Sequence, residues 1–258
     1  MKRFIIIAAA CMSLCSCSLL GAINWNPEAL ASAAGKAMTA ASITDAQIVQ
    51  LSAQSVAQMD AQNKVETGAY AQRLSRLLSH VKVDGIKQLN FKVYNTPEIN
   101  AFACADGSIR VYTGLMDVMD DGELLAILGH EIGHVVHQDS KNAMKKAYMA
   151  SAARDVVASA GSLGAISSAV MGDISEAFLQ AKFSQKQEFA ADEYGFNFAV
   201  ANGQSPYSMA TALEKLVNLS NGRQASAVAQ MFSSHPDSAK RAAIMRQKAV
   251  EYTTASKK

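Results

Sequence analysis

The sequence predicts an α+β fold that is mainly helical and contains one small, mainly antiparallel β-sheet of about three strands. Two observations carry this prediction. Apolar residues recur at helical spacing over most of the chain, and only the region around 89–113 alternates between apolar and polar residues. Of the 258 residues, 50% are hydrophobic and 18% are charged, which is typical of a globular chain that can bury a sizeable core.

The first 16 residues predict a signal peptide rather than part of the fold. Lys2 and Arg3 precede an apolar run from Phe4 to Met12, which is too short to span a bilayer as an anchor. The segment ends in Leu14-Cys15-Ser16-Cys17, which resembles the lipobox of bacterial lipoproteins. This pattern predicts cleavage before Cys17 and lipidation of that residue.

A lipid on Cys17 would hold the chain at a membrane without any spanning helix, because each buried methylene contributes about 0.8 kcal/mol. In lipoproteins of this type, Ser18 in place of Asp after the lipidated residue implies sorting to the outer membrane. We therefore expect a lipid-anchored protein of the outer membrane whose folded part faces the periplasm. Residues 17–41, rich in Ala, Ser and Gly, suit a tether, and residues 42–258 are expected to form the folded domain.

Charge and cysteine content exclude other classes of protein. The net charge is +2 and no basic run is longer than two residues, so a nucleic-acid partner is not expected. Three of the four cysteines lie in the first 17 residues, and cleavage leaves only Cys17 and Cys104. Because the lipid would cap the sulfur of Cys17, no internal disulfide is expected. Cys104 lies in an alternating apolar stretch and is expected to be buried as a small hydrophobic residue.

Local sequence patterns predict the individual helices, strands and turns. Ala105-Asp106-Gly107-Ser108 predicts a turn between the last two strands. Asp120 with Glu123 three positions later predicts the start of a helix near Asp121. Residues 156–172 carry no charge, and their Ala- and Ser-rich surroundings suggest a mobile helical hairpin or lid. The expected helices cover 43–59, 70–78, 121 onward, 177–201, 207–219 and 238–251, and the expected strands cover 89–94, 99–104 and 109–113.

Two of the five histidines form the sequence His130-Glu131-Ile132-Gly133-His134 inside the predicted helix. In a chain of this composition an H-E-x-x-H sequence arises by chance with a probability of about 0.004, so the match is specific. Residues four apart on a helix lie about 40° apart around its axis, so His130 and His134 can both bind one metal ion. Zinc suits this nitrogen pair. Glu131 would stand beside the open side of the metal, where it can take a proton from water.

A catalytic zinc site needs a third protein ligand. The metzincin arrangement is excluded, because Ser140 and His137 stand where that class has a His and a Gly. The other arrangement takes a Glu from a later helix, and Glu188 with Asp192 offers two acids on one helical face. We expect Glu188 as the third ligand and Asp192 as the acceptor of a hydrogen bond from the far nitrogen of a ligand histidine. The alternative ligands are Glu193 and Glu176.

These residues, with Asn100-Ala101-Phe102-Ala103, Thr113-Gly114-Leu115 and Ser234-His235-Pro236, resemble the Oma1 and BepA group of gluzincin metallopeptidases. The lipobox and the chain length are most similar to the LoiP (YggG) outer-membrane lipoproteins. The resemblance covers about residues 42–250. It implies a zincin-type fold, one zinc ion per chain, and an endopeptidase of the cell envelope that acts on misfolded or unassembled proteins. Other envelope proteases and outer-membrane assembly factors are the further candidate partners.

The resemblance also implies roles for single residues. The zinc ligands fall on His130, His134 and Glu188, and the general base falls on Glu131. A strand whose edge can bind an extended substrate through main-chain hydrogen bonds falls on Asn100, Ala101, Phe102 and Ala103.

His235 approaches the zinc ion in relatives, so two roles stay open for it. It either stabilises the oxyanion that forms during hydrolysis, with Arg241 as a further candidate for that role, or it caps the metal in a resting state. Capping would favour the alternative function, a chaperone-like lipoprotein with latent protease activity that binds outer-membrane clients. A purely structural zinc site is disfavoured. Such sites prefer four protein ligands, often Cys, with no open position, and the mature domain holds only Cys104.

Overall fold

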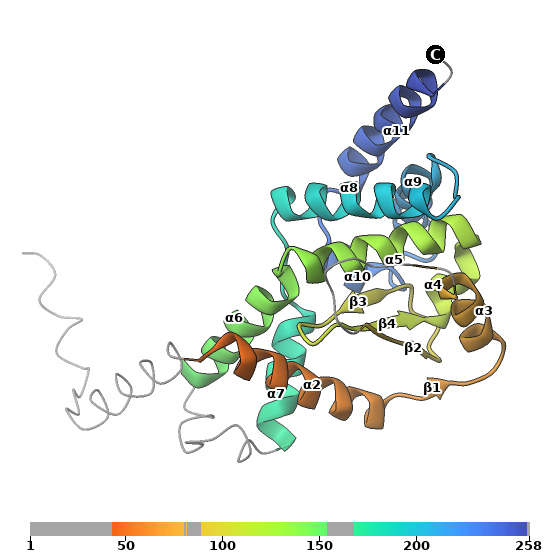
Figure 1. Ribbon diagram of the computed structural model, residues 1–258. Helices are drawn as coiled ribbons and strands as arrows, with labels where there is room; N and C mark the ends of the chain where they lie inside the picture. Colours follow the sequence, from red (N-terminus) through yellow and green to blue (C-terminus); the bar gives the residue numbers. More distant parts are fainter. Residues whose placement is uncertain (1–42, 80, 82–88, 154–167, 257–258) are drawn as a thin grey trace, which may run out of the picture.

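The computed structural model describes residues 43–79, 81, 89–153 and 168–256 (Figure 1). The predicted signal peptide, the lipidation site Cys17 and the tether lie outside the described residues, as does most of the lid predicted at 156–172. The helices are α2 (Asp45–Gln62), α3 (Ala69–Leu78), α4 (Thr113–Val118), α5 (Asp121–Val136), α6 (Asp139–Ala153), α7 (Ser168–Leu179), α8 (Gln185–Ala201), α9 (Ser208–Ser220), α10 (Ala229–Ser234) and α11 (Ser238–Ala255). The strands are β1 (Val65–Glu66), β2 (Asn90–Tyr94), β3 (Ala101–Ala103) and β4 (Ser108–Tyr112).

The fold class is confirmed, and the small sheet, predicted to be mainly antiparallel, is mixed. The described part of the chain forms a four-stranded sheet in the order β1-β2-β4-β3, where the short strand β1 was not predicted. The pairs β1–β2 and β3–β4 are antiparallel, whereas the longest pairing, β2–β4, is parallel. The chain leaves β2, forms β3 at the sheet edge and returns through the predicted turn, where Gly107 has a φ of 85°. This hairpin therefore inserts β4 beside β2 in the same direction.

One predicted helix is divided in the structure. The region 177–201 was expected to be continuous, but α7 ends at Leu179 and α8 begins at Gln185. Ser184 caps the new helix, because its side chain and that of Gln187 form a reciprocal capping box. The restart places Glu188 in the first turn of α8.

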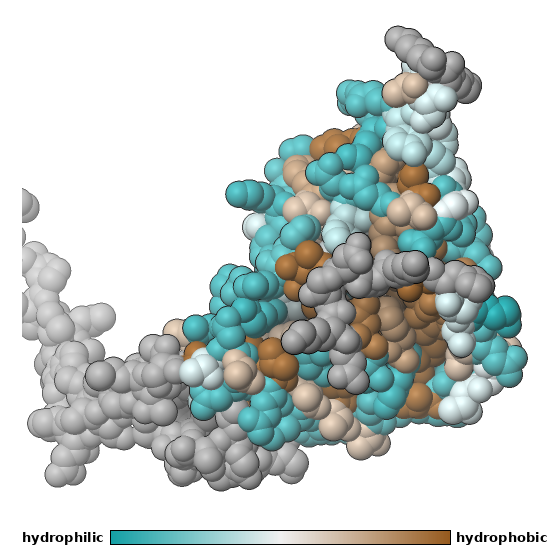
Figure 2. Space-filling model, in the orientation of Figure 1, coloured by the Kyte–Doolittle hydropathy of each residue, from teal (hydrophilic) through white to brown (hydrophobic). Residues whose placement is uncertain are grey.

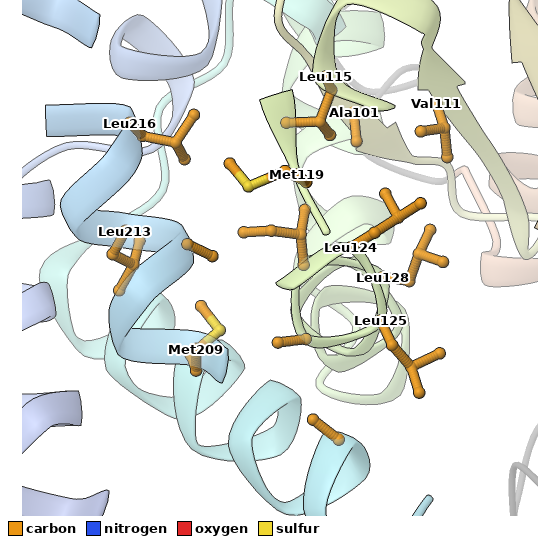
Figure 3. Close-up of a cluster of buried hydrophobic side chains, with 14 of the residues drawn as sticks. Ala101, Val111, Leu115, Met119, Leu124, Leu125, Leu128, Met209, Leu213 and Leu216 are labelled. Atoms are coloured by element: carbon orange, nitrogen blue, oxygen red, sulfur yellow. The ribbon is translucent and has the colours of Figure 1, made fainter. Parts of the chain in front are cut away.

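The two faces of the sheet pack against different helices (Figure 1). On one face, side chains of α5 and α9 form the larger apolar core, as the close-up in Figure 3 shows for Leu124, Leu128 and Leu213. On the other face, Tyr94, Phe102 and the buried Cys104 pack against α2, α6 and α7, so the predicted burial of this cysteine is confirmed. Helix α5 is thereby held between the sheet and helices α8 and α9.

A partly buried charged cluster joins α2 to the sheet. Arg110, 1% exposed, donates to both carboxylate oxygens of Asp60 at 2.8 and 3.0 Å. Lys92 and Tyr94 donate to the same carboxylate at 2.7 Å each. Burial raises the pKa of Asp60, but these hydrogen bonds outweigh it and lower the pKa to about 2. Asp60 is therefore ionised across the physiological pH range.

The described surface carries a groove beside the sheet, and the described helices give no sign of a membrane span. Figure 2 shows apolar side chains gathered beside the sheet and α3. There, Leu74, Leu78, Phe91 and Val93 help to line a groove of about 680 Å³. Within the described ranges, no helix is both long enough and apolar enough to cross a bilayer.

Candidate metal centre

Helix α5 supplies the two histidines and the acid of the H-E-x-x-H sequence. Its start is fixed by a capping box, in which Asp120 accepts from the backbone of Glu123 and the Glu123 side chain accepts from the backbone of Asp120. One helical turn separates His130 from His134, and their Nε2 atoms lie 3.1 Å apart. All three motif side chains are buried, including Glu131.

Helix α8 brings Glu188 to these histidines, as predicted. Oxygen Oε1 of Glu188 lies 3.3 Å from Nε2 of His134, and Oε2 lies 3.9 Å from Nε2 of His130. The two helices approach closely through glycines: a methyl group at Gly195 would meet the carbonyl oxygen of Ala126 at 2.6 Å. The absence of side chains at this contact allows the ligands from α5 and α8 to meet.

His235 completes the cluster from the end of α10. Its Nδ1 atom lies 3.3 Å from Nε2 of His130 and 3.0 Å from Oε1 of Glu188. One donor atom from each of His130, His134, Glu188 and His235 lies within 4.8 Å of the others. His235 therefore stands at the fourth corner of the predicted three-ligand site.

The geometry of this cluster fits a zinc ion. Zinc bonds of 2.0–2.1 Å at tetrahedral angles place neighbouring ligand atoms about 3.3 Å apart. Most of the separations above lie within a few tenths of an ångström of that value. Imidazole and carboxylate are also the donor types that zinc takes in catalytic sites. The buried cluster therefore suits this cation.

In both α5 histidines the nitrogen that points away from the cluster, Nδ1, donates a hydrogen bond to a carboxylate. Nδ1 of His130 donates to Asp192 at 2.9 Å, in the position expected from the sequence. Nδ1 of His134 donates at 3.0 Å to Asp139, a residue that the sequence analysis did not identify. Arg241 lies beneath the cluster: its Nε and Nη2 donate to Asp192 at 2.7 and 2.6 Å, and its Nη1 forms an ion pair with Glu188.

Glu131 lies beside His235 and lines a small cleft next to the cluster. Its Oε1 atom is buried without a hydrogen-bond partner among the described residues and lies 3.8 Å from Nε2 of His235. A cleft of about 20 Å³ joins Glu131 to the predicted substrate strand, Asn100 to Ala103, and to Phe183. Because β3 ends the sheet order, its outer edge pairs with no other strand of the described residues. The strand and the acid thus border the same space.

Phe183 closes this cleft on the side of His134. Its ring stacks on the imidazole of His134, with 4.0 Å between centroids and 17° between planes. Its backbone nitrogen donates to the carbonyl oxygen of Ser234 at 3.1 Å, next to His235. The loop that divides α7 from α8 is therefore part of the site. Sequence patterns did not reveal it, because helical periodicity continues across the break.

Burial and hydrogen bonding shift the pKa values of the side chains in and beside the cluster. Burial lowers the pKa of His130 to about 4, although Asp192 opposes the shift. Burial would also lower the pKa of His134, but the hydrogen bonds to Asp139 and Glu188 outweigh it and raise the pKa to about 9. Binding of a cation by His134 would therefore release a proton. The pKa of Glu131 is raised, mainly by burial, which suits a group that must accept a proton.

The remaining candidates lie outside the cluster. Glu193, the alternative ligand, forms an ion pair with Lys248 at the surface, and Glu176 accepts from Gln180 on α7. His137 is the C-cap residue of α5, and its ring meets the ring of Tyr194 edge-on, with 6.2 Å between centroids.

The chain is similar to known proteases over most of its length. The model of peptidase family M48 matches residues 64–249. Metalloprotease LoiP of Escherichia coli (strain K12) is 39% identical over 235 residues, which cover 89% of this chain and 91% of the relative. Metalloprotease YcaL of the same organism is 36% identical over 253 residues, or 96% of each chain. The β-barrel assembly-enhancing protease of that organism is 30% identical over 191 residues, which cover 67% of this chain and 37% of the relative.

Proposed function

Because the chain belongs to peptidase family M48 and is a zinc-dependent metalloprotease, we propose that it is an endopeptidase of the bacterial cell envelope that cleaves misfolded or unassembled proteins. One observation carries the assignment of the active site. The buried donors of His130, His134 and Glu188 converge, and beside them lies an oxygen of Glu131 that has no hydrogen-bond partner within the described ranges.

In this proposal His130, His134 and Glu188 hold one zinc ion per chain. The ion supplies a Lewis acid that polarises a carbonyl and makes water more acidic. Glu131 takes a proton from the attacking water and delivers it to the nitrogen of the leaving amine. Such hydrolysis needs no covalent intermediate with the protein.

His235 and Arg241 receive different roles. His235 shares the open space with Glu131, so its imidazole can donate to the developing oxyanion. Three guanidinium nitrogens of Arg241 face Asp192 and Glu188. This arrangement supports a role in holding those carboxylates rather than in contacting substrate.

The proposed substrate is an extended segment of an unfolded protein. The outer edge of β3, from Ala101 to Ala103, can pair with a peptide backbone whatever its side chains, which gives broad sequence tolerance. Native proteins keep such segments folded. A cleft of only about 20 Å³ also requires the surrounding segment, including Phe183, to move before a peptide can enter.

The position of His235 favours a second candidate function. Its Nδ1 atom occupies the fourth corner of the ligand cluster, where it can cap the metal. A protein that rests in this state would bind clients as a chaperone-like lipoprotein and would cleave them only after His235 is displaced.

One experiment separates the two functions. Full-length protein, with its zinc content measured, is incubated with casein as an unfolded substrate and with a stably folded protein. We expect cleavage of casein and little cleavage of the folded protein, abolished by a chelator and restored by zinc. If the wild type is inactive but His235→Ala cleaves casein, the latent function is supported. If neither cleaves, the protease proposal fails.

The location rests on the N-terminal sequence. We propose that residues 1–16 are a signal peptide, that Cys17 is lipidated, that residues 17–41 form the tether and that the domain of residues 42–258 faces the periplasm from the outer membrane. Cys17→Ser removes the sulfur that would carry the lipid, so the protein should be lost from the outer-membrane fraction. Unchanged fractionation would contradict the anchor.

Partners follow from the same proposal. Unassembled outer-membrane proteins are the proposed clients, and other envelope proteases or outer-membrane assembly factors are candidate partners, in keeping with the name of the β-barrel assembly-enhancing protease. Nucleic acid is not proposed as a partner.

A further inference from the structure

We propose that Asp139 is a positioning residue for His134, and that Gln187 links it to the start of the helix that carries Glu188. The inference rests on the proposed metal site. Asp139 is 5% exposed, and its two oxygens have different partners. Oδ2 accepts from Nδ1 of His134 at 3.0 Å, and Oδ1 accepts from Nε2 of Gln187 at 2.6 Å.

The backbone is bent to bring Asp139 to this place. Helix α5 ends at Val136, and α6 begins at Asp139, only five residues after His134. Between them Gln138 adopts a φ of 63°, a left-handed conformation that is unfavourable for a residue with a side chain. The described residues contain only one other non-glycine residue of this kind, Asp237, two positions after His235. Both strained positions therefore adjoin the metal cluster.

Gln187 connects two helices with a single amide group. Its Oε1 accepts from the backbone nitrogen and the hydroxyl of Ser184, each at 2.8 Å, and so closes the capping box of α8. Its Nε2 donates to Asp139. Since Glu188 is the next residue, the group that starts α8 also fixes the carboxylate that orients His134. The hydrogen bonds of Gln187 therefore link the position of His134 on α5 to the position of Glu188 on α8.

The two histidines are held in unequal ways. Asp192, behind His130, is paired with the charged guanidinium of Arg241. Among the described residues, the second partner of Asp139 is a neutral amide. More of the negative charge of Asp139 therefore remains available to His134. A carboxylate at Nδ1 fixes the tautomer in which Nε2 presents its lone pair to the metal, and losing such a partner lowers metal affinity or activity by about 10–100-fold.

The test compares the zinc affinity of full-length Asp139→Ala, Asp139→Asn and wild type by competition with a chromophoric chelator. We expect Asp139→Ala to lose about 10–100-fold in affinity, and Asp139→Asn to lose less, because its amide oxygen can still accept from His134. At saturating zinc, kcat on casein should fall in the same order with KM unchanged. Asp45→Asn, which removes an exposed first-turn acid from α2 without touching the site, is the matched control and should match the wild type.

Gln187→Glu tests the link itself. A glutamate at this position still closes the capping box but cannot donate to Asp139, so zinc affinity should fall by a smaller factor than in Asp139→Ala. The inference is overturned if both Asp139 variants bind zinc within twofold of the wild type, or if Asp45→Asn loses affinity equally. Zinc affinity is measured without substrate, so this result can be interpreted even if the protein does not cleave casein.

Discussion

Glu131→Gln retains one zinc ion per chain and loses proteolysis by a factor of at least about 10²–10⁴. The substitution keeps the size and shape of the side chain, and Glu131 is not among the donors that converge on the metal position. An amide cannot accept the proton that the carboxylate takes from water. The measurement is the initial rate of casein cleavage by wild type and variant, beside their zinc content.

His134→Ala is the companion to that variant. It removes a donor of the cluster, so both zinc content and activity should fall. Retained cleavage by Glu131→Gln would contradict its role as the general base. Loss of zinc from Glu131→Gln would instead place Glu131 among the ligands.

Gly195→Ala destabilises the protein and lowers its zinc content together. The added methyl group would meet the backbone of α5 at Ala126 oxygen, 2.6 Å, and at His130 nitrogen, 2.9 Å. Backbone atoms cannot turn aside as a flexible side chain can, so α5 and α8 must separate. Overpacking of this kind costs about 1–3 kcal/mol, and the separation moves Glu188 away from the histidines. Thermal unfolding with and without zinc measures both effects.

Gly172→Ala is the matched control for this prediction. Gly172 also lies in a helix, but the nearest atom to its added methyl group would be Nε2 of Gln58 at 3.7 Å, an ordinary contact. Alanine favours a helix over glycine by about 1 kcal/mol, so this variant should be as stable as the wild type or more so. Equal melting temperatures for Gly195→Ala and Gly172→Ala would contradict a close contact between α5 and α8.

Local spacing explains why much of the site was predictable. His130, Glu131 and His134 share one helix, so their relative directions follow from 3.6 residues per turn. Glu188 and Asp192 form a second local pair, and the need for a third ligand selected them. The start of α5 was predictable as well, because Asp120 and Glu123 form a capping box within four residues.

The missed features depend on contacts between distant segments or on unusual backbone. Alternation predicted β2 and β4 but could not reveal that they pair in parallel, since strand patterns do not state their partners. Asp139 reaches His134 across a bend at which Gln138 has a positive φ, and the residue type of Gln138 does not predict this conformation. Phe183 meets the site through a helix break that the periodicity concealed.

Anomalous diffraction at the zinc edge would show which side chains hold the metal. Crystals of Glu131→Gln loaded with one equivalent of zinc would locate the ion without cleavage of the protein. We expect one strong peak per chain, bonded to Nε2 of His130, Nε2 of His134 and a carboxylate oxygen of Glu188. A principal peak elsewhere, or a bound zinc ion that Glu188 does not contact, would contradict it.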